Sequence, residues 1–77
     1  MDLVLDTSKL LIAIECKLGR TVAASQLGGL RSFSSATKRQ VRSYVVFLGE
    51  HPQRFENNIL AVPFTTFLKD TLPSFPD

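Results

Sequence analysis

The sequence predicts a single α/β domain, and two observations lead to this fold class. Two aliphatic-rich runs, residues 2–6 and 9–17, are separated only by Thr7 and Ser8, so they are expected to pair as an antiparallel β-hairpin. A helix and a further strand are predicted next, and this order is typical of a right-handed parallel crossover. A chain of 77 residues has room for one domain, expected over residues 1–72 and followed by a frayed tail at 73–77.

The second run of the hairpin is predicted to be a central strand of the sheet. Successive side chains of a strand point to opposite faces. One face carries Leu10, Ile12, Ile14 and Cys16, and the other carries Leu11, Ala13, Glu15 and Lys17. Both faces are apolar until the end of the run, which is typical of a strand covered on both sides. Glu15 and Lys17 are therefore expected to emerge together at its C-terminal end, whereas Cys16 is expected in the core.

The remaining elements follow from periodicity and from turn residues. A helix is predicted over residues 21–34, with Thr21 as its N-cap. Its apolar stripe consists of Val22, Ala23, Leu27, Leu30 and Phe33. Two glycines inside it, Gly28 and Gly29, each cost about 1 kcal/mol relative to alanine, which close packing on the sheet would justify. Residues 43–48 and 59–62 are predicted strands and 49–53 a surface loop, before a final helix over 64–72 whose inward side chains are expected to be Phe64, Phe67 and Leu68.

Composition excludes several classes of protein. No apolar run approaches the roughly 18 residues of a membrane-spanning helix, and the start lacks a signal-peptide pattern, so a cytoplasmic protein without a membrane partner is expected. A single cysteine cannot form an internal disulfide, and with His51 as the only histidine a zinc site is not expected. The formal net charge is only +2, yet four basic residues gather within twelve positions: Arg31, Lys38, Arg39 and Arg42. They are candidate contacts for DNA phosphates, unless they are simply a solvated helix end and loop.

One arrangement of residues has a chemical mechanism attached to it. Asp2 stands near the free end of the first hairpin strand and should therefore approach Glu15 and Lys17 at the end of the second. Two carboxylates that meet there offer the oxygen ligands that Mg²⁺ prefers, and Mn²⁺ is an alternative. The metal would activate a water molecule, and Lys17 would stabilise developing negative charge. The other interpretation is a surface ion pair between Glu15 and Lys17, worth about 0 to 1 kcal/mol.

The order of an acidic residue, a hairpin and Glu-x-Lys before a helix and a hydrophobic strand resembles the PD-(D/E)xK, or restriction-endonuclease-like, superfamily. More narrowly, three stretches are similar to the C-terminal domain of unknown function of a group of prokaryotic P-loop ATPases: DLVLDTSKLLIAIECKLGRTVAASQLGGLRSF, YVVFLGE and ILAVPFTTFL. The resemblance runs from Asp2 to about Leu68. A helix usually precedes the first strand of that core, whereas Met1 directly precedes Asp2 here, so a shortened core is expected.

The resemblance implies roles for individual residues. Asp2 and Glu15 would bind the metal, Lys17 would be the catalytic lysine, and Gln26 on the following helix would be a further member of the site. The implied function is Mg²⁺- or Mn²⁺-dependent hydrolysis of phosphodiester bonds in DNA. The alternative is a catalytically silent module that docks a P-loop ATPase or a second copy of itself through an exposed hairpin edge. Because the Gly-x-x-x-x-Gly-Lys-Ser/Thr motif is absent, the chain itself is not expected to hydrolyse ATP.

Overall fold

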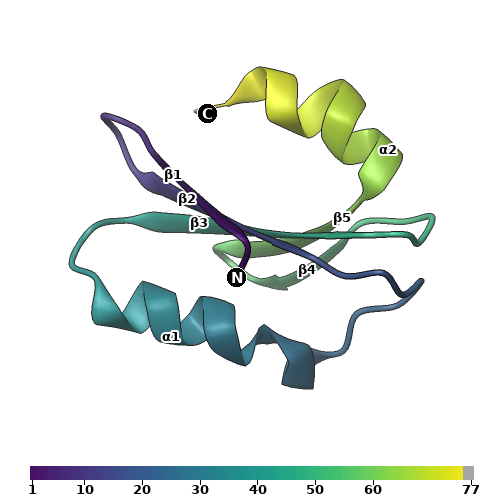
Figure 1. Cartoon of the computed structure of the whole chain (residues 1–77), viewed down its shortest axis with the longest axis horizontal. Coiled ribbons are helices and arrows are strands. Elements are labelled where there is room, and N and C mark those ends of the chain that lie inside the picture. The colour runs from purple at the N-terminus through teal and green to yellow at the C-terminus, as the bar shows by residue number, and fades with distance from the viewer. Residues whose placement is uncertain (76–77) are drawn as a thin grey trace.

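The computed structural model describes residues 1–75, which form three layers with a β-sheet between two helical segments (Figure 1). The strands are β1 (Leu3–Asp6), β2 (Leu11–Cys16), β3 (Val41–Phe47), β4 (Gln53–Glu56) and β5 (Ile59–Pro63). One face of the sheet is covered by the short turn η1 (Ala24–Leu27) and by α1 (Gly28–Ala36). The other face is covered by a segment that consists of α2 (Phe64–Thr66), η2 (Phe67–Thr71) and η3 (Leu72–Ser74).

The sheet has five strands in the order β1-β2-β3-β5-β4. β1 pairs antiparallel with β2, with Leu3 opposite Ile14, and this pair is the predicted hairpin. β2, β3 and β5 run parallel, and β4 returns antiparallel to β5. The connection from β2 through α1 to β3 is the predicted crossover. The α/β fold class, with a hairpin followed by a helix, is therefore confirmed.

Two hydrophobic clusters hold the layers together, one on each face of the sheet. On the α1 face, Leu27 and Leu30 are fully buried. On the opposite face the ring of Tyr44 lies 6.3 Å from that of Phe67 and 5.3 Å from that of Phe75, measured between ring centroids. The alternation predicted for β2 is confirmed, because Ala13 belongs to the first cluster and Ile12 to the second.

The first helical segment begins later than predicted. No helical residue precedes Ala24, and the regular α-helix starts only at Gly28. Thr21 is therefore not the N-cap; a side-chain oxygen of Gln26 instead accepts the N–H of Ala23 at 2.8 Å. The two glycines open α1 rather than interrupt it, so their cost in a helix interior does not apply.

The C-terminal segment turns different side chains inward than the regular periodicity predicts. Phe67 is buried as expected, but Phe64 and Leu68 are each 48% exposed. The reason is that Phe67 alone points straight at the sheet, while Phe64 and Leu68 lie about 60° and about 100° away from it around the helix axis. The segment also extends beyond residue 72, where fraying was expected, and packs Phe75 against Tyr44. Residues 76 and 77 of the predicted tail lie outside the described residues.

Two further features were not anticipated from the sequence. β4 begins at Gln53, where a surface loop was predicted to end, and it forms an edge of the sheet with a half-buried Phe55. Cys16 was expected in the core and is exposed. Alternation assigns a side chain to a face of the sheet, but it does not determine how far the covering layer extends. Within residues 1–75, no helix is long and apolar enough to cross a membrane.

Gly49 is a position where the fold leaves no room for a side chain. A Cβ atom there would lie 2.6 Å from the carbonyl oxygen of Arg20 and would collide with the ring of Phe47. We expect Gly49→Ala to lower the free energy of unfolding by about 1 to 3 kcal/mol, because backbone and ring must both move. Urea unfolding measures this loss.

Gly28 provides the matched control for Gly49. A Cβ added to Gly28 meets no atom within 4 Å. Gly28→Ala is therefore expected to keep or raise the stability, by up to about 1 kcal/mol, because alanine leaves the unfolded chain less conformational freedom than glycine. Equal stabilities for the two alanine variants would contradict this account of the packing around Gly49.

Candidate metal site

The hairpin brings Asp2, Glu15 and Lys17 to the same end of the sheet, as the sequence predicts. The N–H of Asp2 donates to the carbonyl oxygen of Ile14 at 2.9 Å. Its carboxylate oxygen Oδ2 accepts the N–H of Cys16 at 2.7 Å. Cys16 lies directly between Glu15 and Lys17 in the chain, so the start of β1 is fastened beside both charged residues.

The Glu15 carboxylate is enclosed and paired with positive charge. Glu15 is only 7% exposed, although it carries a charge. Its Oε1 lies 3.0 Å from the Met1 ammonium nitrogen, and its Oε2 lies 3.0 Å from Nζ of Lys17. The first turn of α1 passes over it, since a Cβ on Gly29 would lie 3.7 Å from Oε1. The site therefore holds a buried carboxylate together with concentrated positive charge.

The surroundings of Glu15 set its protonation state. Burial is the largest single influence and raises the pKa of Glu15. The hydrogen bonds and charges of the Met1 ammonium and of Lys17 together outweigh burial, and they bring the pKa below its ordinary value of 4.5. Glu15 is therefore ionised at neutral pH, which both an ion pair and a metal ligand require.

This lowered pKa predicts how stability depends on pH. A carboxylate whose pKa is lower in the folded chain stabilises the fold above its unfolded-state pKa, and this contribution disappears as the pH falls through the folded-state value. We expect Glu15→Gln to be less stable than the wild type at neutral pH and the gap to shrink well below pH 4.5. Urea unfolding of both proteins across this range measures the gap. A gap that stays constant would contradict the role of the Glu15 charge.

The donor set is small but suits a hard divalent cation. Among residues 1–75, no group of three or more His, Cys, Asp or Glu side chains gathers closely enough to hold a metal ion. Mg²⁺ commonly takes only one or two carboxylates and completes its shell with water and substrate phosphates. Asp2 and Glu15 carry oxygen ligands of this kind, and each oxygen of Glu15 already has an ammonium group beside it. Binding of Mg²⁺ or Mn²⁺ by these two residues stays a prediction.

Gln26, the other residue that the resemblance implicates, has a local structural contact. It lies on η1, and its exposed side chain caps this turn through the Ala23 N–H. A part in catalysis for Gln26 stays a prediction.

Two of the four basic residues lie at opposite edges of the sheet. Arg39 donates to Oδ1 of Asp6 at 2.7 Å and to the carbonyl oxygen of Thr7 at 2.6 Å, next to β1. Arg31 pairs with Glu56 on β4. β1 and β4 are separated by the three parallel strands, so these arginines do not share a surface.

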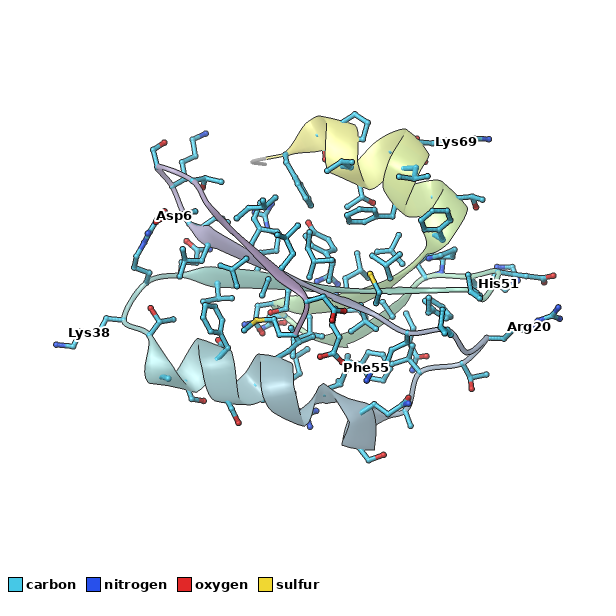
Figure 2. The ribbon with its side chains drawn as sticks, in the orientation of Figure 1. Asp6, Arg20, Lys38, His51, Phe55 and Lys69 are labelled. Atoms are coloured by element: carbon cyan, nitrogen blue, oxygen red, sulfur yellow. The ribbon has the colours of Figure 1, made fainter. Side chains whose placement is uncertain are left out.

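The other two basic residues occupy two more places. Lys38 is exposed in the connection between α1 and β3, and its side chain points away from the body of the domain (Figure 2). Arg42 is half-buried on β3, on the same face of the sheet as Tyr44. The cluster seen in the sequence is thus distributed around the fold, and DNA contacts by these residues stay a prediction.

A pocket of about 590 Å³ at the same end of the sheet was not predicted. The N–H of Lys17 donates to the carbonyl oxygen of Val46, and the N–H of Leu48 donates to the carbonyl oxygen of Gly19. The chain segments after β2 and β3 therefore remain side by side. The pocket lies between them, and its lining includes Arg20 and His51 (Figure 2). Ligands of α/β sheets commonly bind outside the carboxyl ends of parallel strands. The signal in the sequence that could have indicated this pocket is the pair of loops that follow two adjacent strands.

Comparison with known proteins gives a family but no activity. None of the curated proteins and none of the solved structures compared shows a significant match to the chain. A family model described as "Domain of unknown function (DUF4143)" matches residues 1–67, which include Asp2, Glu15 and Lys17. The chain therefore belongs to the DUF4143 family.

Proposed function

We propose that this domain hydrolyses phosphodiester bonds in DNA with the help of Mg²⁺ or Mn²⁺. The supporting observation is the convergence of Asp2, Glu15 and Lys17 at the carboxyl end of β2, with the Glu15 and Lys17 side chains 3.0 Å apart. Two carboxylates and a lysine at one strand end provide cation ligands and a positive charge for a phosphate. This is the function that the geometry supports best.

Each of the three residues has a distinct part in this proposal. Asp2 and Glu15 would hold the cation, and the Cys16 N–H orients the Asp2 carboxylate. When bound, the cation would polarise a phosphoryl oxygen and lower the pKa of a water molecule. Lys17, whose Nζ lies 3.0 Å from Glu15, would stabilise the negative charge that develops on the phosphate. Lys38 and Arg39, which are adjacent and exposed, lie beside the start of β3, at the other end of the sheet, and are proposed as contacts to phosphates farther along the DNA.

The direct test is nicking of supercoiled plasmid DNA by the full chain. We expect nicked product with Mg²⁺ or Mn²⁺ and none with a chelator. Calorimetry on the same preparation measures cation binding separately from cleavage. Cation binding without cleavage would reject hydrolysis, and the absence of both would reject the site as well.

A second candidate function is a catalytically silent interaction module. It is favoured because the charged groups of Asp2, Glu15 and Lys17 already have partners within the chain. Both oxygens of Glu15 have an ammonium partner, and Asp2 holds the N–H of Cys16. In this case the trio would only fasten β1 to β2, and the domain would dock a P-loop ATPase or a second copy. Indifference of the chain to divalent cations would favour this candidate.

A further inference from the structure

The two edges of the sheet differ in their protection against pairing with another strand. β4, at one edge, carries Gln53, Arg54 and Glu56, and its register with β5 shifts between Arg54 and Glu56. Charged residues and irregular register are two devices that prevent edge-to-edge pairing. β1, at the other edge, has the sequence Leu-Val-Leu-Asp and pairs regularly with β2 over all four residues. β1 therefore lacks the protection that β4 has.

The backbone of β1 offers hydrogen-bonding groups at this open edge. The N–H of Thr7 donates to the carbonyl oxygen of Leu10 at 3.0 Å. Hydrogen-bonded and non-hydrogen-bonded pairs alternate along an antiparallel ladder, so Leu3 and Leu5 also turn their backbone groups toward β2. The N–H and C=O groups of Val4 and Asp6 consequently point away from β2, where no strand of the described chain lies (Figure 1).

The side chains of β1 make the same edge apolar on both faces of the sheet. Leu3 is 51% exposed and Val4 is 38% exposed. Leu3 stands opposite Ile14, on the face of the C-terminal segment, and Val4 stands opposite Ala13, on the face of α1. An added strand would thus gain hydrogen bonds and would bury aliphatic surface above and below the sheet.

We propose that β1 pairs antiparallel with β1 of a second copy of this chain, which joins the two sheets into one. The register centred on Val4 places Val4 opposite its own copy and Leu3 opposite Leu5 of the second copy. Aliphatic residues then face aliphatic residues, which is the favourable kind of cross-strand pair. Asp2 stands opposite Asp6 of the second copy, but its carboxylate is already bound to the Cys16 N–H of its own chain, and Asp6 is already paired with Arg39 at 2.7 Å, so neither carboxylate is left without a partner.

A second copy fits this edge because β1 is itself an exposed aliphatic strand of the complementary kind. Antiparallel pairing of two identical strands has two-fold symmetry, so one contact covers both open edges. The edges left over are the two β4 strands, whose charges and irregular register oppose further growth. The assembly therefore closes as a dimer. This inference does not rest on the metal site, and the dimer is expected with or without divalent cations.

Amide hydrogen exchange measured by NMR at several protein concentrations tests the contact directly. The Val4 and Asp6 amides are expected to become protected as the concentration rises, in parallel with a doubling of the mass in light scattering. The Leu3 and Leu5 amides, which face β2, should change much less. A monomeric mass at every concentration, or exchange at Val4 and Asp6 that ignores concentration, would overturn the proposal.

Two variants locate the contact on β1. Val4→Pro removes an outward N–H and should give a monomer, since proline is tolerated on an edge strand where its N–H would face solvent. Val4→Lys adds a charge at the same edge and gives an independent reading if the proline variant does not fold. Leu68→Lys is the control, because Leu68 is 48% exposed on the C-terminal segment, and it should remain dimeric. A dimer that survives Val4→Lys, or that only Leu68→Lys disrupts, would refute the β1 interface.

Discussion

Replacing Lys17 with methionine is expected to reduce metal-dependent nicking of DNA by roughly 10²- to 10³-fold, the usual loss when one preorganised electrostatic contact to a transition state is removed. Methionine keeps much of the length of the side chain but not its charge. Glu15 retains its second partner, the Met1 ammonium at 3.0 Å, so the carboxylate stays paired. Nicking rates under saturating Mn²⁺ measure the effect on turnover.

The control for this substitution is Lys69→Met on the opposite helical layer (Figure 2). Lys69 is exposed there, and the variant should nick DNA like the wild type. Calorimetry should show that Lys17→Met still binds the divalent cation, because the substitution removes a positive charge that would repel the ion. Wild-type nicking by Lys17→Met would remove the lysine from the proposed chemistry.

Truncating Leu30 to alanine is expected to lower the free energy of unfolding by about 2 to 5 kcal/mol. Leu30 is the one residue of α1 with complete burial, and it belongs to the cluster that fixes this helix to the sheet. Small domains have little stability to spare, so the variant should unfold at a clearly lower temperature than the wild type. Thermal unfolding followed by circular dichroism measures the shift, about 4 to 8 °C per kcal/mol for a domain of this size.

Leu68→Ala is the matched control, since it removes the same atoms from a side chain that is 48% exposed. Its stability should stay within about 0.5 kcal/mol of the wild type. Similar losses for the two variants would contradict the burial of Leu30 in the cluster on the α1 face.

The parts of the fold that local patterns determine could be predicted from the sequence. Alternation along β2 assigned Ala13 and Ile12 to opposite faces and placed Glu15 with Lys17, because the side-chain period of a strand is fixed. The short connection at Thr7 and Ser8 required an antiparallel hairpin, and the hairpin brought Asp2 to the end of β2. The core of the candidate site follows from these local rules.

Features that depend on distant contacts could not be predicted in this way. Asp6 and Arg39 are 33 residues apart in the chain, and their contact exists only once β1 and the start of β3 are in place. Four basic residues that are close in the sequence therefore do not make one surface. Phe64 and Leu68 are half exposed because the contacts of Phe67 with Tyr44 and Phe75 set which side of the segment points inward, and the spacing of apolar residues does not show this direction.

Titration of the full chain with Mn²⁺ by calorimetry tests the central claim, that Asp2 and Glu15 form a cation site. The account predicts one ion bound per chain, loss of binding in Glu15→Gln and weaker binding in Asp2→Asn. Each substitution removes a carboxylate charge at nearly constant volume, so altered binding reports on ligation rather than on packing. A wild-type chain that takes up no ion, or a Glu15→Gln chain that binds as tightly as the wild type, would contradict the claim.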